Sequence, residues 1–303
     1  LSAIPAALFA TSAQADISVS GSANAAYTDA GGNASATYGG GVSFSMSTTT
    51  DAGVTITGSS AISNDSDSVG SSSGATGITA LTFGFAGGSI TIGGDVGTPD
   101  GVGKVGELVG YADDNQVAKT AVVGLTEDEG DGVSISTSVG DMSITGVYVF
   151  DGGGGGNVDG AANTASGASL SMALGAGTLT IATADEDING TNNSEVGVAY
   201  VMSAAGGTLS LGFTGTDGDT AAKEGEAVSA SFSTSLGGAS VAIGYTSHDA
   251  NNQQSNQTDV TASSSLGGGA SIFAEYTTVS GDIAANSSTK DATVIALGTS
   301  ISF

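Results

Sequence analysis

The sequence predicts an all-β fold: a 16-stranded antiparallel transmembrane β-barrel with one loop folded inward. Three observations predict it. Apolar and polar residues alternate with a period of two along short segments, short glycine-rich turns alternate with longer polar connections, and the number of segments is even.

The composition favours strands and excludes several functions. The chain has 303 residues, of which 51 are glycine and two are proline, and it contains no cysteine. Gly, Ser and Thr are mediocre or poor helix formers, so long helices are not expected. With 39% apolar and 11% charged residues, the chain does not have the composition of a disordered acidic segment. The absence of cysteine excludes disulfides and thiolate-bound metals.

The charge is strongly negative, with four lysines, no arginine and 30 acidic residues for a net charge of -26. Nucleic-acid binding requires cationic groups on the phosphates, so no nucleic-acid partner is expected. An acidic surface attracts cations and repels anions. An equally supported interpretation of most of these acids is that they keep an exposed surface solvated.

The first 15 residues differ from the rest. Their apolar run, Ala3 to Ala10, is followed by small residues ending in Ala13-Gln14-Ala15, which is typical of the cleavage end of a secretory signal peptide. We interpret residues 1–15 as a truncated signal peptide and residues 16–303 as a single barrel domain; an ordinary N-terminal strand or helix is the weaker alternative. No apolar run long enough for a transmembrane helix follows, so a protein of this sequence in a membrane would span it as a barrel.

The period of two is clear in the first segment, where Ile17, Val19 and Tyr27 share one face and Ser18 and Ser20 the other. The expected strands lie within 16–28, 42–47, 54–57, 81–85, 90–92, 133–139, 142–150, 170–174, 179–181, 196–202, 209–213, 228–232, 241–245, 260–266, 272–276 and 293–303. The polar face carries Ser, Thr, Gly and Ala, which suits water, whereas a soluble sandwich would bury apolar residues from both faces.

The connections alternate in kind. Glycine-rich turns such as Gly140-Asp141 suit tight hairpins, whereas most acids fall in the other connections. The expected acidic loops are 65–67, 151–159, 185–195, 217–226, 249–259 and 282–291. Short turns at one end and long polar loops at the other describe an outer-membrane barrel, and 16 strands leave an aqueous channel. Aromatics near the ends of the apolar faces, such as Tyr148 and Tyr245, suit interfacial girdles.

Residues 95–120 follow no strand period, and we interpret them as a loop that folds into the barrel and narrows it. Its segment from Gly106 to Asp114, GELVGYADD, resembles the constriction loop of the general diffusion porins of the Gram-negative outer membrane, in particular the acidic trimeric porins of purple photosynthetic bacteria. The terminal TSISF is similar to that family's assembly signal, which implies that Phe303 is read by the barrel-insertion machinery. The resemblance covers the layout of the whole mature chain and implies a homotrimer in outer-membrane lipid. It departs from the family in one respect, because no arginine is available to oppose the loop.

The expected function is passive diffusion of small hydrophilic solutes and cations through a water-filled channel. Asp100, Glu107, Asp113 and Asp114 would line the constriction, and carboxylates in a confined pore attract cations and exclude anions. No cofactor is required. Calcium is a candidate counter-ion because it takes carboxylate oxygens, while solvated loop acids are an equally supported alternative. The candidate calcium ligands are Asp113, Asp114, Glu127, Asp128, Glu129 and Asp131.

Two other classes of function are less well supported by the sequence than a channel. Catalysis has little support because the single histidine, His248, adjoins a polar segment with no fixed nucleophile, so the chain is not expected to be an enzyme. An acidic β-rich structural or adhesive surface protein would share the export signal and the acidity. It would need neither the apolar closing strand nor the alternation of short turns and long loops.

Overall fold

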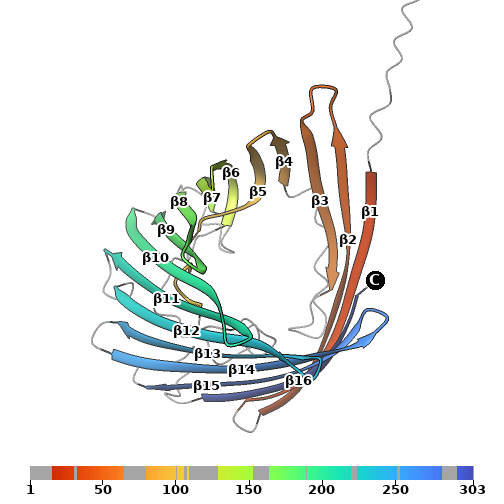
Figure 1. Cartoon of the computed structure of the whole chain (residues 1–303), viewed down its shortest axis with the longest axis vertical. Helices are drawn as coiled ribbons and strands as arrows, with labels where there is room; N and C mark the ends of the chain where they lie inside the picture. The colour runs from red at the N-terminus through yellow and green to blue at the C-terminus, as the bar shows by residue number, and fades with distance from the viewer. Residues whose placement is uncertain are drawn as a thin grey trace, which may run out of the picture.

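The computed structural model describes residues 16–30, 33–64, 80–99, 101–105, 108, 129–152, 164–188, 190–219, 224–250, 253–281 and 292–302. Within these ranges the strands form one closed antiparallel barrel of 16 strands, in which each strand pairs with its neighbours in sequence and β1 closes against β16 (Figure 1). Among the described residues, no helical segment has the length and hydropathy needed to cross a membrane. The predicted fold class and strand number are confirmed.

The strands are longer than the sequence pattern indicated. Their bounds are β1 (Asp16–Ala30), β2 (Asn33–Thr49), β3 (Thr55–Asn64), β4 (Ala80–Phe85), β5 (Gly88–Gly97), β6 (Glu129–Val139), β7 (Met142–Gly152), β8 (Thr164–Leu174), β9 (Gly177–Ile188), β10 (Thr191–Ala204), β11 (Gly207–Gly218), β12 (Gly225–Leu236), β13 (Ala239–Ala250), β14 (Gln253–Gly267), β15 (Ala270–Gly281) and β16 (Ala292–Ser302). The predicted acidic loops 185–195 and 249–259 are therefore wrong as loops, because most of their residues belong to strands.

The outer face of the barrel carries a band of apolar side chains. Residues paired across neighbouring antiparallel strands share a face, so the register traces rows around the wall. One such row consists of Ile144, Leu170, Ile181, Val198 and Phe213. In a soluble protein these side chains would form an unfavourable exposed surface, whereas lipid-facing positions of a membrane barrel require them.

The band ends within a few residues along the strands. A second row on the same face runs through Tyr148, Ser166, Asp185, Ser194 and Asp217. Tyr148 is 52% exposed, and Asp185 and Asp217 are also exposed. An aromatic residue followed by carboxylates marks the level at which lipid tails give way to polar surroundings.

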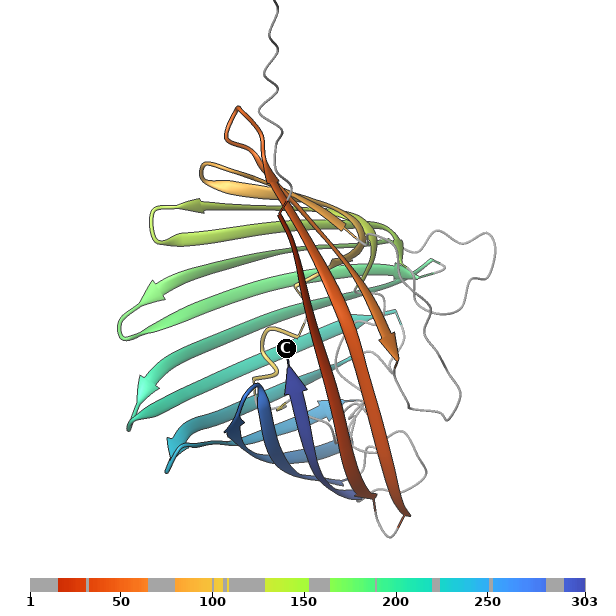
Figure 2. The ribbon, with the colours of Figure 1, turned by 90° about the vertical axis from the view of Figure 1, so that its right-hand side faces the viewer.

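Short turns gather at one end of the barrel (Figure 2). They join β6 to β7, β8 to β9 and β10 to β11 through two residues each. The first turn residue has a positive φ at Gly140 (61°), Gly175 (61°) and Ala205 (50°). Glycine adopts this conformation without strain, which explains its frequency in the predicted turns.

The inner face at this end is lined by short hydroxyl side chains that bond to one another across strands. Thr82 and Thr91 lie 2.8 Å apart between their hydroxyl oxygens, as do Ser171 and Thr180, and Ser136 and Thr145 are 2.9 Å apart. Such side chains are hydrated and project little into the barrel. The predicted division into an apolar outer face and a hydroxyl-rich inner face is confirmed.

Candidate functional site: a loop seated on the inner wall

The chain enters the barrel interior after β5. A register shift between Gly93 and Val96 interrupts the pairing of β5 with β6, and Val96 is only 2% exposed. Val96 packs with Val147, Val149 and Ala165, which belong to the inner faces of β7 and β8. This small apolar cluster fixes the base of the loop against the wall, because burial removes its side chains from the water of the channel.

Three wall glycines make room for the loop backbone. A Cβ built on Gly167 would lie 2.5 Å from the Cδ of Pro99, and one on Gly197 would lie 3.1 Å from the Cβ of Val102. A Cβ on Gly212 would lie 2.0 Å from the carbonyl oxygen of Gly103. These glycines belong to β8, β10 and β11, so they form a track on which the loop lies closer than a side chain would allow.

Hydrogen bonds continue the path across the wall. The Gly101 N–H donates to Oε1 of Glu195 on β10, and the Ser229 hydroxyl on β12 donates to the Gly103 carbonyl at 2.5 Å. Further along, the Leu108 N–H donates to Oδ2 of Asp259 on β14 at 3.2 Å. The described part of the loop therefore crosses the inner wall from β5 to β14, which supports the predicted inward fold.

The inner wall of the described strands carries several acidic residues. The inner faces of β9, β10, β14 and β15 carry Glu186, Glu195, Asp259 and Glu275. Glu186, Glu195 and Asp259 are buried, with 2%, 2% and 1% of their surface exposed, whereas Glu275 is partly exposed. The single histidine, His248, is also buried on this inner face.

Basic residues are scarce around this wall. Lys104 lies in the described part of the loop and is half-buried, while the other three lysines fall outside the described residues. The chain has no arginine that could face the loop. The electrostatic character of the described inner wall is therefore set by carboxylates.

Most of the predicted site residues fall outside the described ranges. They are Asp100, Glu107, Asp113, Asp114, Glu127, Asp128 and Phe303, and the side chain of Glu129 is also outside them. Asp131 is exposed in β6, in register with Asp151 of β7. In the part of the chain that is described, no three His, Cys, Asp or Glu residues are grouped as metal ligands. Both the constriction set and the calcium ligands remain predictions.

The wall residues that hold the loop were not predicted from the sequence. Glu195 and Asp259 were expected at the ends of acidic loops, whereas both lie within strands and point inward. Ser229 was one serine among many. The signal that could have found this surface is the set of inward glycines, since Gly167, Gly197 and Gly212 each lie between inward-facing neighbours that carry side chains.

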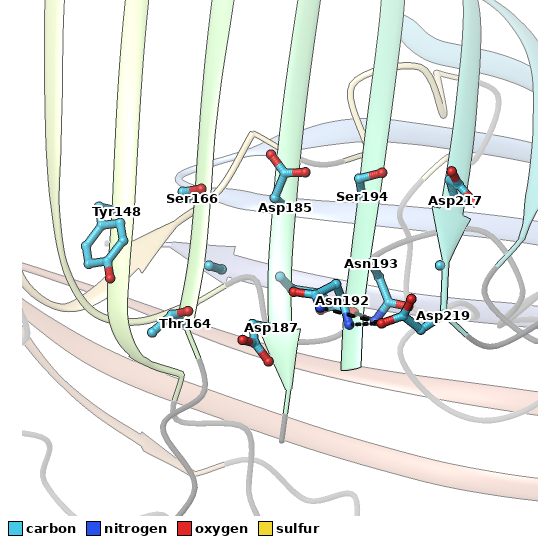
Figure 3. A pocket seen from close by; sticks show the side chains of 13 residues that line it. Tyr148, Thr164, Ser166, Asp185, Asp187, Asn192, Asn193, Ser194, Asp217 and Asp219 are labelled. Atoms are coloured by element: carbon cyan, nitrogen blue, oxygen red, sulfur yellow. Dashed lines mark hydrogen bonds between the residues drawn. The ribbon is translucent and has the colours of Figure 1, made fainter. Parts of the chain in front are cut away.

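A further acidic feature lies where β9 and β11 end and β8 and β10 begin. A pocket of about 460 Å³ is bordered by Asp185, Asp187, Asp217 and Asp219 (Figure 3). Two of these carboxylates hold backbone at the strand ends: Asp187 accepts the Gly190 N–H at 2.8 Å and Asp219 accepts the Asn192 N–H at 2.9 Å. These acids were predicted as loop acids. Asp187 closes the β9–β10 hairpin, and Asp219 joins the end of β11 to the start of β10.

Solved porin structures share this architecture. The anion-selective porin from Comamonas acidovorans matches 96% of this chain and 100% of its own with a TM-score of 0.70 at 14% identity. The in-vitro folded, trimer form of OmpT from Vibrio cholerae matches 95% of this chain and 99% of its own, with a TM-score of 0.72 at 10% identity. A variant of the Rh. blastica porin covers 95% of this chain and 100% of its own, with a TM-score of 0.69 at 16% identity. At these identities the likeness concerns the fold.

The sequence itself carries a family assignment. No curated protein is similar enough to match. The Gram-negative porin family, by contrast, matches residues 2–287, which is nearly the whole chain. This match agrees with the closed barrel, the lipid-facing apolar band and the loop seated in the interior. The chain belongs to the Gram-negative porin family and forms an outer-membrane channel.

Proposed function

We propose that this channel conducts small hydrophilic solutes by passive diffusion and prefers cations to anions. The observation that carries the preference is the inner wall of the described strands, where the partly exposed carboxylate of Glu275 faces the channel in a chain that has 30 acidic residues, four lysines and no arginine. The proposal rests on the residues of this chain and not on its fold, since a structurally similar porin from Comamonas acidovorans is anion-selective.

The physical basis is the field inside a narrow aqueous space. Carboxylates on low-dielectric walls lower the energy of a cation in the pore and raise that of an anion. A carboxylate acts strongly on a passing ion when it is in contact with the water of the channel. Glu275 is partly exposed and therefore contributes directly. The predicted loop residues Asp100, Glu107, Asp113 and Asp114 would add to this field.

We propose further that three copies assemble as a trimer with separate pores. One structurally similar protein, OmpT of Vibrio cholerae, is described in a trimer form, and the resemblance to the general diffusion porins points the same way. A trimer of independent channels inserts into a bilayer as one unit. Each insertion should therefore add the conductance of three pores at once, and closure at high voltage should follow in three equal steps.

The first measurement is the reversal potential of the refolded protein in a planar bilayer with a tenfold KCl gradient across it. We expect a potential of the sign that indicates potassium passing more readily than chloride, and weaker selectivity at high salt because screening shortens the range of the field. A potential near zero, or one of the opposite sign, contradicts the cation preference while leaving the channel. Absence of any conductance by a folded barrel contradicts the diffusion function.

A single substitution tests the role of the wall. Replacing Glu275 by glutamine removes one charge from the lumen at nearly constant shape, so the reversal potential is expected to move toward zero with little change in conductance. Thr261, the paired inner-face residue on β14, offers the control: Thr261→Val keeps the shape and removes no charge. Equal reversal potentials for Glu275→Gln and the unmodified protein would contradict the role given to Glu275 in selectivity.

A further inference from the structure

One aromatic side chain breaks the division between an apolar outer face and a hydroxyl-rich inner face. Phe273 of β15 lies in an inward-facing row, between Ser263 of β14 and Gly298 of β16. The register places every other Phe and Tyr residue of the 16 described strands on the outer face. Lipid accounts for the outward aromatics, so the inward one requires a different explanation.

The ring of Phe273 leans across the wall onto Gly298. A Cβ built on Gly298 would lie 2.6 Å from Cε1 of the ring and closer still to Cζ, so any other residue at this position would displace the ring. Glycine thus lets the ring lie against the backbone of the neighbouring strand, as in other cross-strand pairs of an aromatic residue with glycine. Phe273 remains partly exposed, so part of the ring reaches the interior of the barrel.

The surroundings of the ring differ on its two sides along β15. Toward the short turns, the hydroxyl oxygens of Ser271 and Ser300 lie 2.7 Å apart and form a neutral lining. In the other direction the next inward residue is Glu275, which is also partly exposed. Residues two apart in a strand are separated by about 6.5 Å. One small ion can therefore contact the ring with one side and the carboxylate with the other.

We propose that Phe273 and Glu275 form a subsite that binds small organic ammonium ions on their way through the channel. The subsite names a class of permeant solute and rests on the diffusion function proposed above. An aromatic face attracts a cation through its quadrupole, and the neighbouring carboxylate adds a charge attraction. The methyl groups of an alkylated ammonium ion also leave water when they pack on the ring. Potassium has no apolar surface to bury, so the ring favours the organic ion.

A purely structural role for Phe273 gives a different expectation. If the ring served only to cover Gly298, its replacement would change the stability of the barrel and leave the binding of organic ions unchanged. The subsite instead requires that loss of the ring weakens the binding of an organic cation more than that of potassium.

The test measures single-channel conductance in rising concentrations of tetramethylammonium chloride and, separately, of KCl. Conductance saturates when a cation occupies a site in the channel, so the half-saturating concentration reports binding. We expect a lower value for tetramethylammonium than for potassium. Phe273→Leu keeps an apolar side chain and should raise the tetramethylammonium value about two- to fivefold, the size of a partly exposed cation–π contact, with little change for KCl. Phe273→Tyr keeps the aromatic face and should retain the unmodified values.

Two further variants locate the effect. Glu275→Gln should raise the half-saturating concentration of tetramethylammonium and also move the KCl reversal potential toward zero, whereas Phe273→Leu should change only the first. Tyr276 is the neighbouring aromatic residue of β15 on the outer face, where it is 43% exposed. Tyr276→Leu removes a ring that faces lipid and should change neither measurement.

Each outcome supports or overturns the subsite. Heat-modifiable migration on a gel identifies variants that form a barrel, and only these are compared. Equal tetramethylammonium values for Phe273→Leu and the unmodified protein would overturn it. Equal values for tetramethylammonium and potassium in the unmodified protein would do the same, without requiring any variant to fold. A ring-dependent fall in KCl conductance on adding glucose, with no ring-dependent effect of tetramethylammonium, would assign Phe273 to neutral sugars and also overturn it.

The proposed ion preference fails in a different measurement. A KCl reversal potential near zero, or of the opposite sign, in the unmodified protein would contradict that preference, whatever the response to tetramethylammonium. A cation-favouring KCl potential together with no effect of Phe273→Leu would contradict the subsite alone.

Discussion

Replacing Gly212 by alanine is expected to narrow the channel, with a lower single-channel conductance in a barrel that still folds. The new Cβ would lie 2.0 Å from the Gly103 carbonyl oxygen and 2.8 Å from the Ser229 hydroxyl. The clash is with main-chain atoms of Gly103, which cannot rotate away as a side chain could. The loop must therefore move away from the wall and toward the channel axis. Overpacking of this kind typically costs about 1–3 kcal/mol, which a barrel with this many ladder hydrogen bonds should tolerate.

A matched control is available on another strand. Gly84 lies on the inner face of β4, and a Cβ there would meet only ordinary contacts at 3.7 Å and beyond. Gly84→Ala should leave conductance unchanged, and comparison of the two variants in planar bilayers isolates the effect of the loop. If Gly212→Ala conducts like the unmodified protein, the loop is not held against β11 in the membrane.

Replacing Leu211 by lysine is expected to impair folding into the membrane severely. Leu211 is 45% exposed on the outer face of β11, midway along the apolar run formed with Leu209 and Phe213. A lysine on the lipid face near the bilayer midplane costs about 2–4 kcal/mol. The expected result is a lower yield of heat-modifiable barrel in lipid and a urea unfolding midpoint shifted to lower concentration.

The neighbouring residue offers the opposite result. Ser210 points inward, in register with Val201 of β10 and Ser231 of β12. Ser210→Lys should fold like the unmodified protein and shift the reversal potential away from cation preference, because the charge sits in the aqueous lumen. A barrel that tolerates Leu211→Lys but not Ser210→Lys would mean that the two faces of β11 are assigned the wrong way round.

The number, order and facing of the strands could be predicted because lipid and water impose opposite demands on alternate residues. Strand ends could not be predicted in this way. Beyond the apolar band both faces of a strand are polar. The segment with Asp185 and Asp187 therefore has the composition of a loop, although both residues belong to β9. Backbone pairing extends there because antiparallel hairpins gain ladder hydrogen bonds without requiring apolar side chains.

The inward path of the loop was predicted from a family resemblance and from the absence of strand alternation in residues 95–120. No physical signal within the loop itself indicated it. Its seat depends on contacts between residues about 90 to 150 positions apart, such as Gly101 with Glu195 and Leu108 with Asp259. Only the closed barrel brings these residues together, so no local pattern reveals them. The acids that the sequence assigned to the constriction, by contrast, stay a prediction.

The hydroxyl pairs at the turn end of the barrel have an electrical consequence. Ser171 with Thr180 and Ser136 with Thr145 give that section of the lumen a neutral lining of short side chains, and a wide column of electrolyte has low resistance. A voltage applied across the membrane therefore falls mainly over the short section occupied by the loop. The loop and its wall contacts experience most of the transmembrane field, while the rest of the barrel conducts as an extension of the bathing solution.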